Sequence, residues 1–338
     1  MGIDRLGENN YRNDYMDIAK GILIILVVIG HSGFKYSKYI YWFHMPAFFF
    51  ISGYFFKEIN GYKQFVIFTK IKVIKTLYPY ILSLIIIAIL NYYIYPFKIT
   101  SKYVKDLLYG GRLLQGSYGV FWFVTCLLIT QIIFGALNTI TKSKKLTFVN
   151  IFILYLLAHI ESYYICVKNH SINVPLNFDV ALFSLLFFCL GYYSKNLLIK
   201  TFSLDKIKIL LITIFTNTLC IFLIRLDYSK KFNYLLDLKY VRYNHVILDI
   251  IIPMLFIITI ILDSYFIKQM KMLQSIGQNS IWIMYIHIPI NYYLRKYYNY
   301  NWLIFSIIGI TIPVLFSSIY KKFMNTRKQH LNCNNNIN

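Results

Sequence analysis

Long apolar runs without charged residues recur along this chain and limit the folds open to it. A helix needs about 20 residues to cross a bilayer core roughly 30 Å thick, and several of these runs approach that length. The pattern predicts an all-α integral membrane protein with about ten transmembrane helices. We expect crossings near residues 17–34, 40–56, 75–95, 118–138, 146–166, 176–194, 207–225, 246–266, 276–293 and 302–320. The second run contains His44, Pro46, Ser52 and Gly53, so a broken or re-entrant helix is the alternative there.

Composition supports this class. Of 338 residues, 58% are hydrophobic and 14% are charged, whereas about a quarter of the residues of soluble domains are charged. The 35 Lys and Arg residues outnumber the 13 acidic ones, but they fall in short loops, where they anchor helices at lipid headgroups. No basic patch forms a surface of its own, so we expect a lipid bilayer as partner and no nucleic acid.

The distribution of charge predicts the orientation. Ten crossings place both termini on one side, and the connections on that side carry the larger share of Lys and Arg, which favours N-in and C-in. Residues 1–15 would then be a cytoplasmic segment and residues 322–338 a disordered cytoplasmic tail. The first apolar run is too long for a signal peptide and should remain as a span. We expect a multi-pass protein of the cell (inner or plasma) membrane with no separate soluble domain.

The five cysteines do not predict a metal site or a disulfide framework. Four lie in or beside apolar runs and one lies near the C-terminus, without the spacing of metal ligands. We therefore expect no bound metal.

The first apolar run contains two ionisable residues, Lys20 and His31. They are about 16 Å apart along a helix, so one lies near the inner face and the other past the middle of the bilayer. Ionisable groups at such depth usually serve function. The simpler reading for Lys20 is that it reaches the inner headgroups and pairs with Asp17, three residues earlier.

Other polar residues fall at the depth of His31. With the N-terminus inside, His44 and Trp122 each lie about four residues below the outer face, and His287 lies past the middle of its span. The sequence thus predicts a polar outer cavity opposite an inner cation. His44 also suits an interfacial role, and His287 a hydrogen bond between helices. The outer half of the predicted bundle contains four further polar residues, which also suit an interfacial position: Glu161, Asp179, Arg225 and Asp249.

These residues resemble a known family. The run from Asp17 to His31 and the segment Trp42-Phe-His-Met-Pro-Ala-Phe-Phe-Phe-Ile-Ser-Gly-Tyr54 resemble the membrane acyltransferase-3 family, and within it the fucose 4-O-acetylase-like branch. Three later segments agree in order and placement, and they begin at Gly119, Phe187 and Ile276. The resemblance assigns 16–321 as the transmembrane acyltransferase domain.

The resemblance implies an O-acetyltransferase that moves acetyl from acetyl-CoA to a sugar hydroxyl of a cell-surface polysaccharide. Its partners would be acetyl-CoA, as donor rather than bound cofactor, and a glycan or lipid-linked saccharide. Lys20 and Asp17 would bind the donor phosphates, and His31 would act as general base or acyl acceptor, oriented by His287 or His44. The candidates for substrate binding are Trp122, Ser52, Asn279, Glu161 and Arg225.

Two departures and two alternatives accompany this assignment. Many relatives have arginine at the position of Lys20, and lysine keeps the charge but loses the bidentate fork. Some relatives also carry a soluble hydrolase-like domain, which another protein would supply if transfer needs it. A polysaccharide exporter, flippase or polymerase shares the many apolar spans, and transfer of succinyl or another acyl group remains open, as does homo-oligomerisation.

Overall fold

The computed structural model describes residues 5–94, 101–141, 143–168, 173–243 and 245–335. These residues are almost entirely helical, and the only strand-like pairing among them is a single bridge between Asp237 and Arg242. The elements are α1 (Arg5–His31), α2 (Ser37–Tyr41), α3 (His44–Tyr54), α4 (Tyr62–Ile94), α5 (Ser101–Tyr109), η1 (Gly111–Leu113), η2 (Gly116–Tyr118), α6 (Trp122–Thr141), α7 (Lys144–Lys168), η3 (Pro175–Asn177), α8 (Phe178–Tyr193), α9 (Lys195–Phe202), α10 (Lys206–Tyr228), α11 (Leu248–Phe266), α12 (Lys271–Gln278), α13 (Ser280–Leu294) and α14 (Trp302–Asn335).

Seven of the ten expected crossings are helices long and apolar enough to span a bilayer. In the described part of the chain these are α4, α6, α7, α8, α10, α11 and α14. The other three expected crossings correspond to α1, α3 and α13. The second expected crossing is interrupted at Trp42 and Phe43, between α2 and α3. The 11 residues of α3 extend only about 16 Å, about half of a bilayer core.

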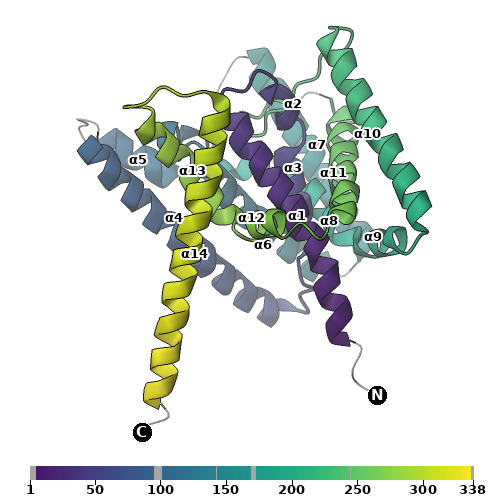
Figure 1. Cartoon of the computed structure of the whole chain (residues 1–338). Helices are drawn as coiled ribbons and strands as arrows, with labels where there is room; N and C mark the ends of the chain where they lie inside the picture. The colour runs from purple at the N-terminus through teal and green to yellow at the C-terminus, as the bar shows by residue number, and fades with distance from the viewer. Residues whose placement is uncertain (1–4, 95–100, 142, 169–172, 244, 336–338) are drawn as a thin grey trace.

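The long helices surround α1 and α3 (Figure 1). The N-terminal end of α1 and the C-terminal end of α14 lie on the same side, at the bottom of this view, while α10 and α14 lie on opposite flanks. Helix α14 continues to Asn335, so it includes most of residues 322–338, which we expected to form a cytoplasmic tail. No glycine or proline follows Pro313 to end that helix. Residues 1–4 and 336–338 of the two expected terminal segments lie outside the described residues.

Two glycines allow α3 and α8 to pack backbone to backbone. A Cβ atom on Gly53 would lie 1.9 Å from the carbonyl oxygen of Phe188, and one on Gly191 would lie 1.9 Å from that of Phe50. Only glycine permits so close an approach. Every residue of α3 except Ser52 is buried, so this crossing places α3, with His44 at its first position, in the interior.

A second pair of glycines joins α1 to α12. A Cβ atom on Gly277 would lie 1.8 Å from the carbonyl oxygen of Asp17, and one on Gly21 would lie 2.2 Å from that of Leu273. The short helix α12 therefore packs directly on the Lys20 end of α1. Because α13 follows α12 after Asn279, the same crossing fixes where α13 starts.

Adding a methyl group at the first crossing should destabilise the protein. Because α3 and α8 would have to separate, Gly53→Ala should lower the free energy of unfolding by about 1–3 kcal/mol. Gly30→Ala is the control, since its Cβ would meet nothing nearer than 3.5 Å, and alanine inside a helix stabilises by about 0.5–1 kcal/mol over glycine. Thermal unfolding in detergent measures both, and equal midpoints for Gly53→Ala and the unmodified protein would refute the crossing.

Candidate active site

A cavity of about 330 Å³ lies at the His31 end of α1. Its walls come from α1, α3, α13, the start of α6 and two long connections. The polar and aromatic side chains that line it are His31, Tyr41, His44, Gln115, Trp122, Phe123, Asp237, Lys239 and Tyr240. The sequence predicted three of these residues, His31, His44 and Trp122, to lie at a similar depth in the bilayer and to line one cavity.

His31 is the last residue of α1 and is half-buried. Its ring centroid lies 5.6 Å from that of His287 and 6.2 Å from that of Tyr41. The hydroxyl of Tyr41 donates to the carbonyl of Gly30 at 2.7 Å, which fixes Tyr41 against the end of α1. The imidazole of His31 thus lies between the open cavity and the buried ring of His287.

The hydrogen bonds of His287 and His44 define which ring nitrogen is available. Nδ1 of His287 lies 2.7 Å from the carbonyl oxygen of Ile283, and Nδ1 of His44 lies 2.8 Å from that of Ile40. A carbonyl only accepts, so Nδ1 carries the proton and Nε2 keeps its lone pair. Nε2 of His287 is buried and has no hydrogen-bond partner among the described residues. This buried nitrogen beside His31 therefore keeps the capacity to accept a hydrogen bond.

Lys239 supplies a cation to the same cavity. Its ammonium donates to the carbonyl oxygens of Leu114 at 2.7 Å and Gly119 at 3.0 Å. These bonds use two of its three N–H groups, and no carboxylate in the described residues forms an ion pair with it. Burial lowers the pKa of Lys239 to about 8, while nearby Asp237 opposes the shift. Burial also raises the pKa of Asp237.

Trp122 begins α6 and is 6% exposed. Its indole forms part of the apolar wall of the cavity, together with Val120, Phe123 and Met284. A flat aromatic surface next to polar groups is suited to stack on a sugar ring or an acyl group.

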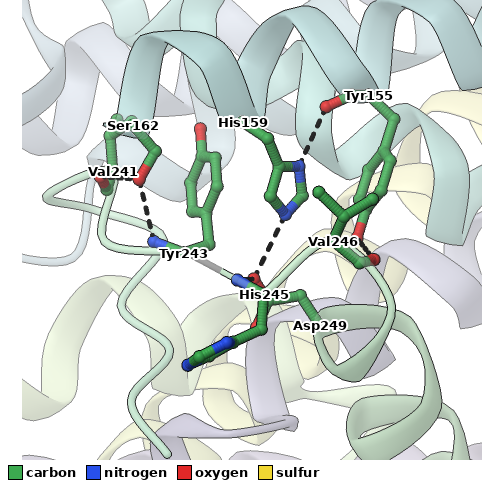
Figure 2. Close-up of polar contacts among 8 residues, drawn as sticks. All are labelled: Tyr155, His159, Ser162, Val241, Tyr243, His245, Val246 and Asp249. Carbon is green, nitrogen blue, oxygen red and sulfur yellow. Dashed lines mark hydrogen bonds and ion pairs between the residues drawn. The ribbon is translucent and has the colours of Figure 1, made fainter. Parts of the chain in front are cut away.

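A network of hydrogen bonds holds the connection that carries Lys239. Figure 2 shows this connection bonded to α7 and α11. Asp249 accepts from the backbone N–H of His245 at 2.9 Å and lies 3.1 Å from Nε2 of His159. Ser162 donates to the carbonyl of Val241 at 2.8 Å and accepts from the N–H of Tyr243 at 3.0 Å. We call these contacts the 229–247 clasp.

A buried ion pair holds the other connection. Arg112 in η1 pairs with Asp179 at the start of α8, and the carbonyl of Arg112 accepts from the amide of Gln115 at 2.8 Å. This fixes the segment that carries Gln115 and the carbonyl of Gly119. Asp179 and Asp249, which the sequence singled out by depth, thus each position a segment that lines the cavity.

Lys20 and Asp17 lie apart from the histidines. They form an ion pair of 2.5 Å, and Asp17 also accepts from the amide of Gln278 at 3.1 Å. Lys20 lies over the ring of Phe55, 5.1 Å from its centroid. It does not line the cavity, which extends along α1 only as far as Val27.

Five other candidates also lie outside the cavity lining, and the buried His287 is one of them. Asn279 precedes α13, and its side chain accepts from Ser317 at 2.7 Å, which joins α13 to α14. Ser52 lies on α3, Glu161 on α7 near Arg112, and Arg225 is exposed near the end of α10. Sequence reasoning missed Lys239, Asp237 and Gln115. Their signal was their location in residues 96–117 and 226–245, the two longest connections between the expected crossings on the side opposite the N-terminus.

No metal site accompanies these residues. In the described ranges, no group of three or more His, Cys, Asp or Glu side chains is arranged to hold a metal ion.

Removing Asp249 should loosen the 229–247 clasp. Asp249→Ala loses hydrogen bonds to a charged acceptor, each contributing about 1.5–3 kcal/mol, so trypsin should cut at exposed Lys230 and Lys231 about tenfold faster or more. Asp263→Ala is the control. Asp263 lies on the same helix, but it accepts a hydrogen bond from Asn217 at 3.0 Å, away from this connection. This variant should leave cleavage at that site unchanged, and equal rates in the two variants would contradict the clasp.

Comparisons with known proteins agree with the family resemblance. A family model described as "Acyltransferase domain", of the acyltransferase-3 type, matches residues 13–321. Nodulation protein NolL of Sinorhizobium fredii (strain NBRC 101917 / NGR234) is 33% identical over 149 residues, 40% of each chain. Nodulation protein NolL of Mesorhizobium japonicum (strain LMG 29417 / CECT 9101 / MAFF 303099) is 32% identical over 150 residues, 40% of this chain and 38% of the relative.

The match thus spans less than half of the length of these curated relatives. No solved structure matches the chain. The family match, however, covers almost the whole transmembrane region. The chain belongs to the acyltransferase-3 family, as a multi-pass membrane member.

Proposed function

We propose that this protein is an O-acetyltransferase that moves acetyl from acetyl-CoA to a sugar hydroxyl of a cell-surface polysaccharide, as in the fucose 4-O-acetylase-like branch. The observation that carries the proposal is the position of His31. It lies in a cavity with a half-buried cation and next to a buried imidazole whose Nε2 has no hydrogen-bond partner in the described part of the chain. The family supplies acyl transfer as the reaction.

In the proposed reaction His31 acts as general base. Its imidazole takes the proton of the sugar hydroxyl as the sugar oxygen bonds to the thioester carbonyl carbon, which gives a tetrahedral oxyanion. The C–S bond then breaks, and the CoA sulfur takes the proton back from His31. Nε2 of His287 is a hydrogen-bond acceptor that would orient His31 and stabilise its charged form.

Lys239 is the group best suited to stabilise the oxyanion. Its ammonium is held by two carbonyls, so its third N–H does not need to reorganise when negative charge develops. His44 and Trp122 would then shape the sides of the acceptor pocket. Asp237 and Gln115 offer oxygen and amide groups that pair with sugar hydroxyls.

The donor would enter from the Lys20 end, which we place in the cytoplasm. Lys20 and Asp17 lie there on α1, and a cation at that end suits the phosphates of CoA. Leu23 and Ile24 are buried between Lys20 and the cavity. A pantetheine arm that runs along α1 would therefore displace these two side chains.

His31→Ala should abolish transfer without loss of the protein from the membrane. General base catalysis contributes about 10²–10⁴-fold, so release of CoA from acetyl-CoA in the presence of the surface glycan should fall by that factor. His245→Ala, which removes an exposed histidine from the 229–247 connection, should retain activity. Unchanged glycan acetylation in His31→Ala would rule out the proposed role.

Lys239→Met should lower kcat about 10²–10³-fold, the usual effect of removing one oxyanion donor. Because burial lowers the pKa of Lys239 to about 8, the ammonium is lost as pH rises through that value, and wild-type kcat should fall there. Lys239→Arg keeps its charge and should lack this alkaline decline. A normal kcat in Lys239→Met, with the same alkaline decline, would exclude Lys239 as the donor.

A further inference from the structure

His31 also lines a second cavity, of about 420 Å³, whose lining does not include Lys239. Its other lining residues are Ile288, Tyr292, Arg295, Lys296 and Phe305. Ile288 also lines the first cavity. His31 and Ile288 therefore line both cavities, and a ligand in the second cavity also reaches the candidate base.

Two exposed cations line the second cavity, and Lys296 donates to the carbonyl of Ile94. Arg295 donates to the carbonyl of Ser32 at 3.1 Å, and its guanidinium lies 4.6 Å from the ring centroid of Phe305 and 5.4 Å from that of Tyr300. No carboxylate in the described residues forms an ion pair with Arg295. A guanidinium held by stacking, with unused N–H groups, is ready to bind a phosphate in bidentate fashion.

The surroundings favour a phosphate that is attached to a lipid. Helix α14, which supplies Phe305, exposes Leu303, Ile304 and Ile307 on its outer face. In a multi-pass membrane protein such a face lies against acyl chains. A lipid tail could thus remain in the bilayer beside α14 while its polar head enters the cavity next to His31.

We propose that the second cavity binds the phosphate of a lipid-linked saccharide acceptor, with Arg295 as its main contact and Lys296 beside it. The sugar attached to that phosphate would extend past Ile288 toward the first cavity, where acyl transfer takes place. This inference rests on the proposed function, because it makes His31 the meeting point of donor and acceptor.

The test measures occupancy of the cavity without turnover. The full chain in phosphatidylcholine nanodiscs is treated with diethyl pyrocarbonate, and mass spectrometry follows modification of His31. Dodecyl phosphate is the probe, dodecyl maltoside the neutral control of equal chain length, and glucuronate the soluble carboxylate. Dodecyl phosphate alone should slow modification of His31, about tenfold when the cavity is mostly occupied.

Variants assign the effect to Arg295. Arg295→Gln should require about tenfold more dodecyl phosphate or more for the same protection, the usual effect of losing a charge-assisted hydrogen bond, and Arg295→Lys should lie between. Arg242→Gln removes an exposed charge outside both cavities and should behave as wild type.

Three outcomes would overturn the proposal. Equal protection by dodecyl maltoside would indicate apolar binding only, and equal protection by glucuronate would indicate a carboxylate site. Equal protection by phosphatidylglycerol at the same molar fraction would indicate an ordinary headgroup site. These outcomes concern protection of His31 from modification. The proposed function is tested separately, by the loss of acyl transfer in His31→Ala.

Discussion

The site depends on one constraint: a polar side chain inside an apolar helical bundle must find its hydrogen-bond partner within the protein. Three buried histidines, His44, His159 and His287, satisfy this constraint in the same way, through a hydrogen bond between Nδ1 and the carbonyl four residues earlier in the chain. The ring is thereby fixed and Nε2 is directed elsewhere. In His159 this nitrogen contacts Asp249, and the contact joins α7 to α11. In His287 it has no partner in the described residues, and His31 is the neighbouring ring.

The same constraint explains the two buried carboxylates. Asp179 binds Arg112 and Asp249 binds the backbone of His245, so each fixes one of the two long connections above the end of α1. Lys239 then joins the two connections, because it comes from the second and donates to carbonyls of the first. A cavity built in this way keeps a cation beside His31. Such a fixed arrangement is what acyl transfer requires of an oxyanion site.

Part of this could be predicted from the sequence. The apolar runs gave the helical class and seven of the ten expected crossings, and depth along the helices brought His31, His44 and Trp122 together. The short α3 was expected only as an alternative, because hydropathy does not register the interruption at Trp42 and Phe43. Hydropathy also does not register the glycine contacts between α3 and α8. Lys239 and Arg295 were missed for a different reason. Cations in loops and at helix ends usually meet headgroups, and only the tertiary contacts of these two distinguish them.

The central claim is that the thioester carbonyl reacts between His31 and Lys239. An electron cryo-microscopy structure of the full chain with acetonyl-CoA, a ketone analogue that cannot transfer its acyl group, tests it most directly. We predict the ketone oxygen about 3 Å from Nζ of Lys239 and the carbonyl carbon beside the His31 ring, with the adenosine phosphates near Lys20. An analogue bound with its ketone outside the first cavity, with His31 unchanged, would contradict the claim.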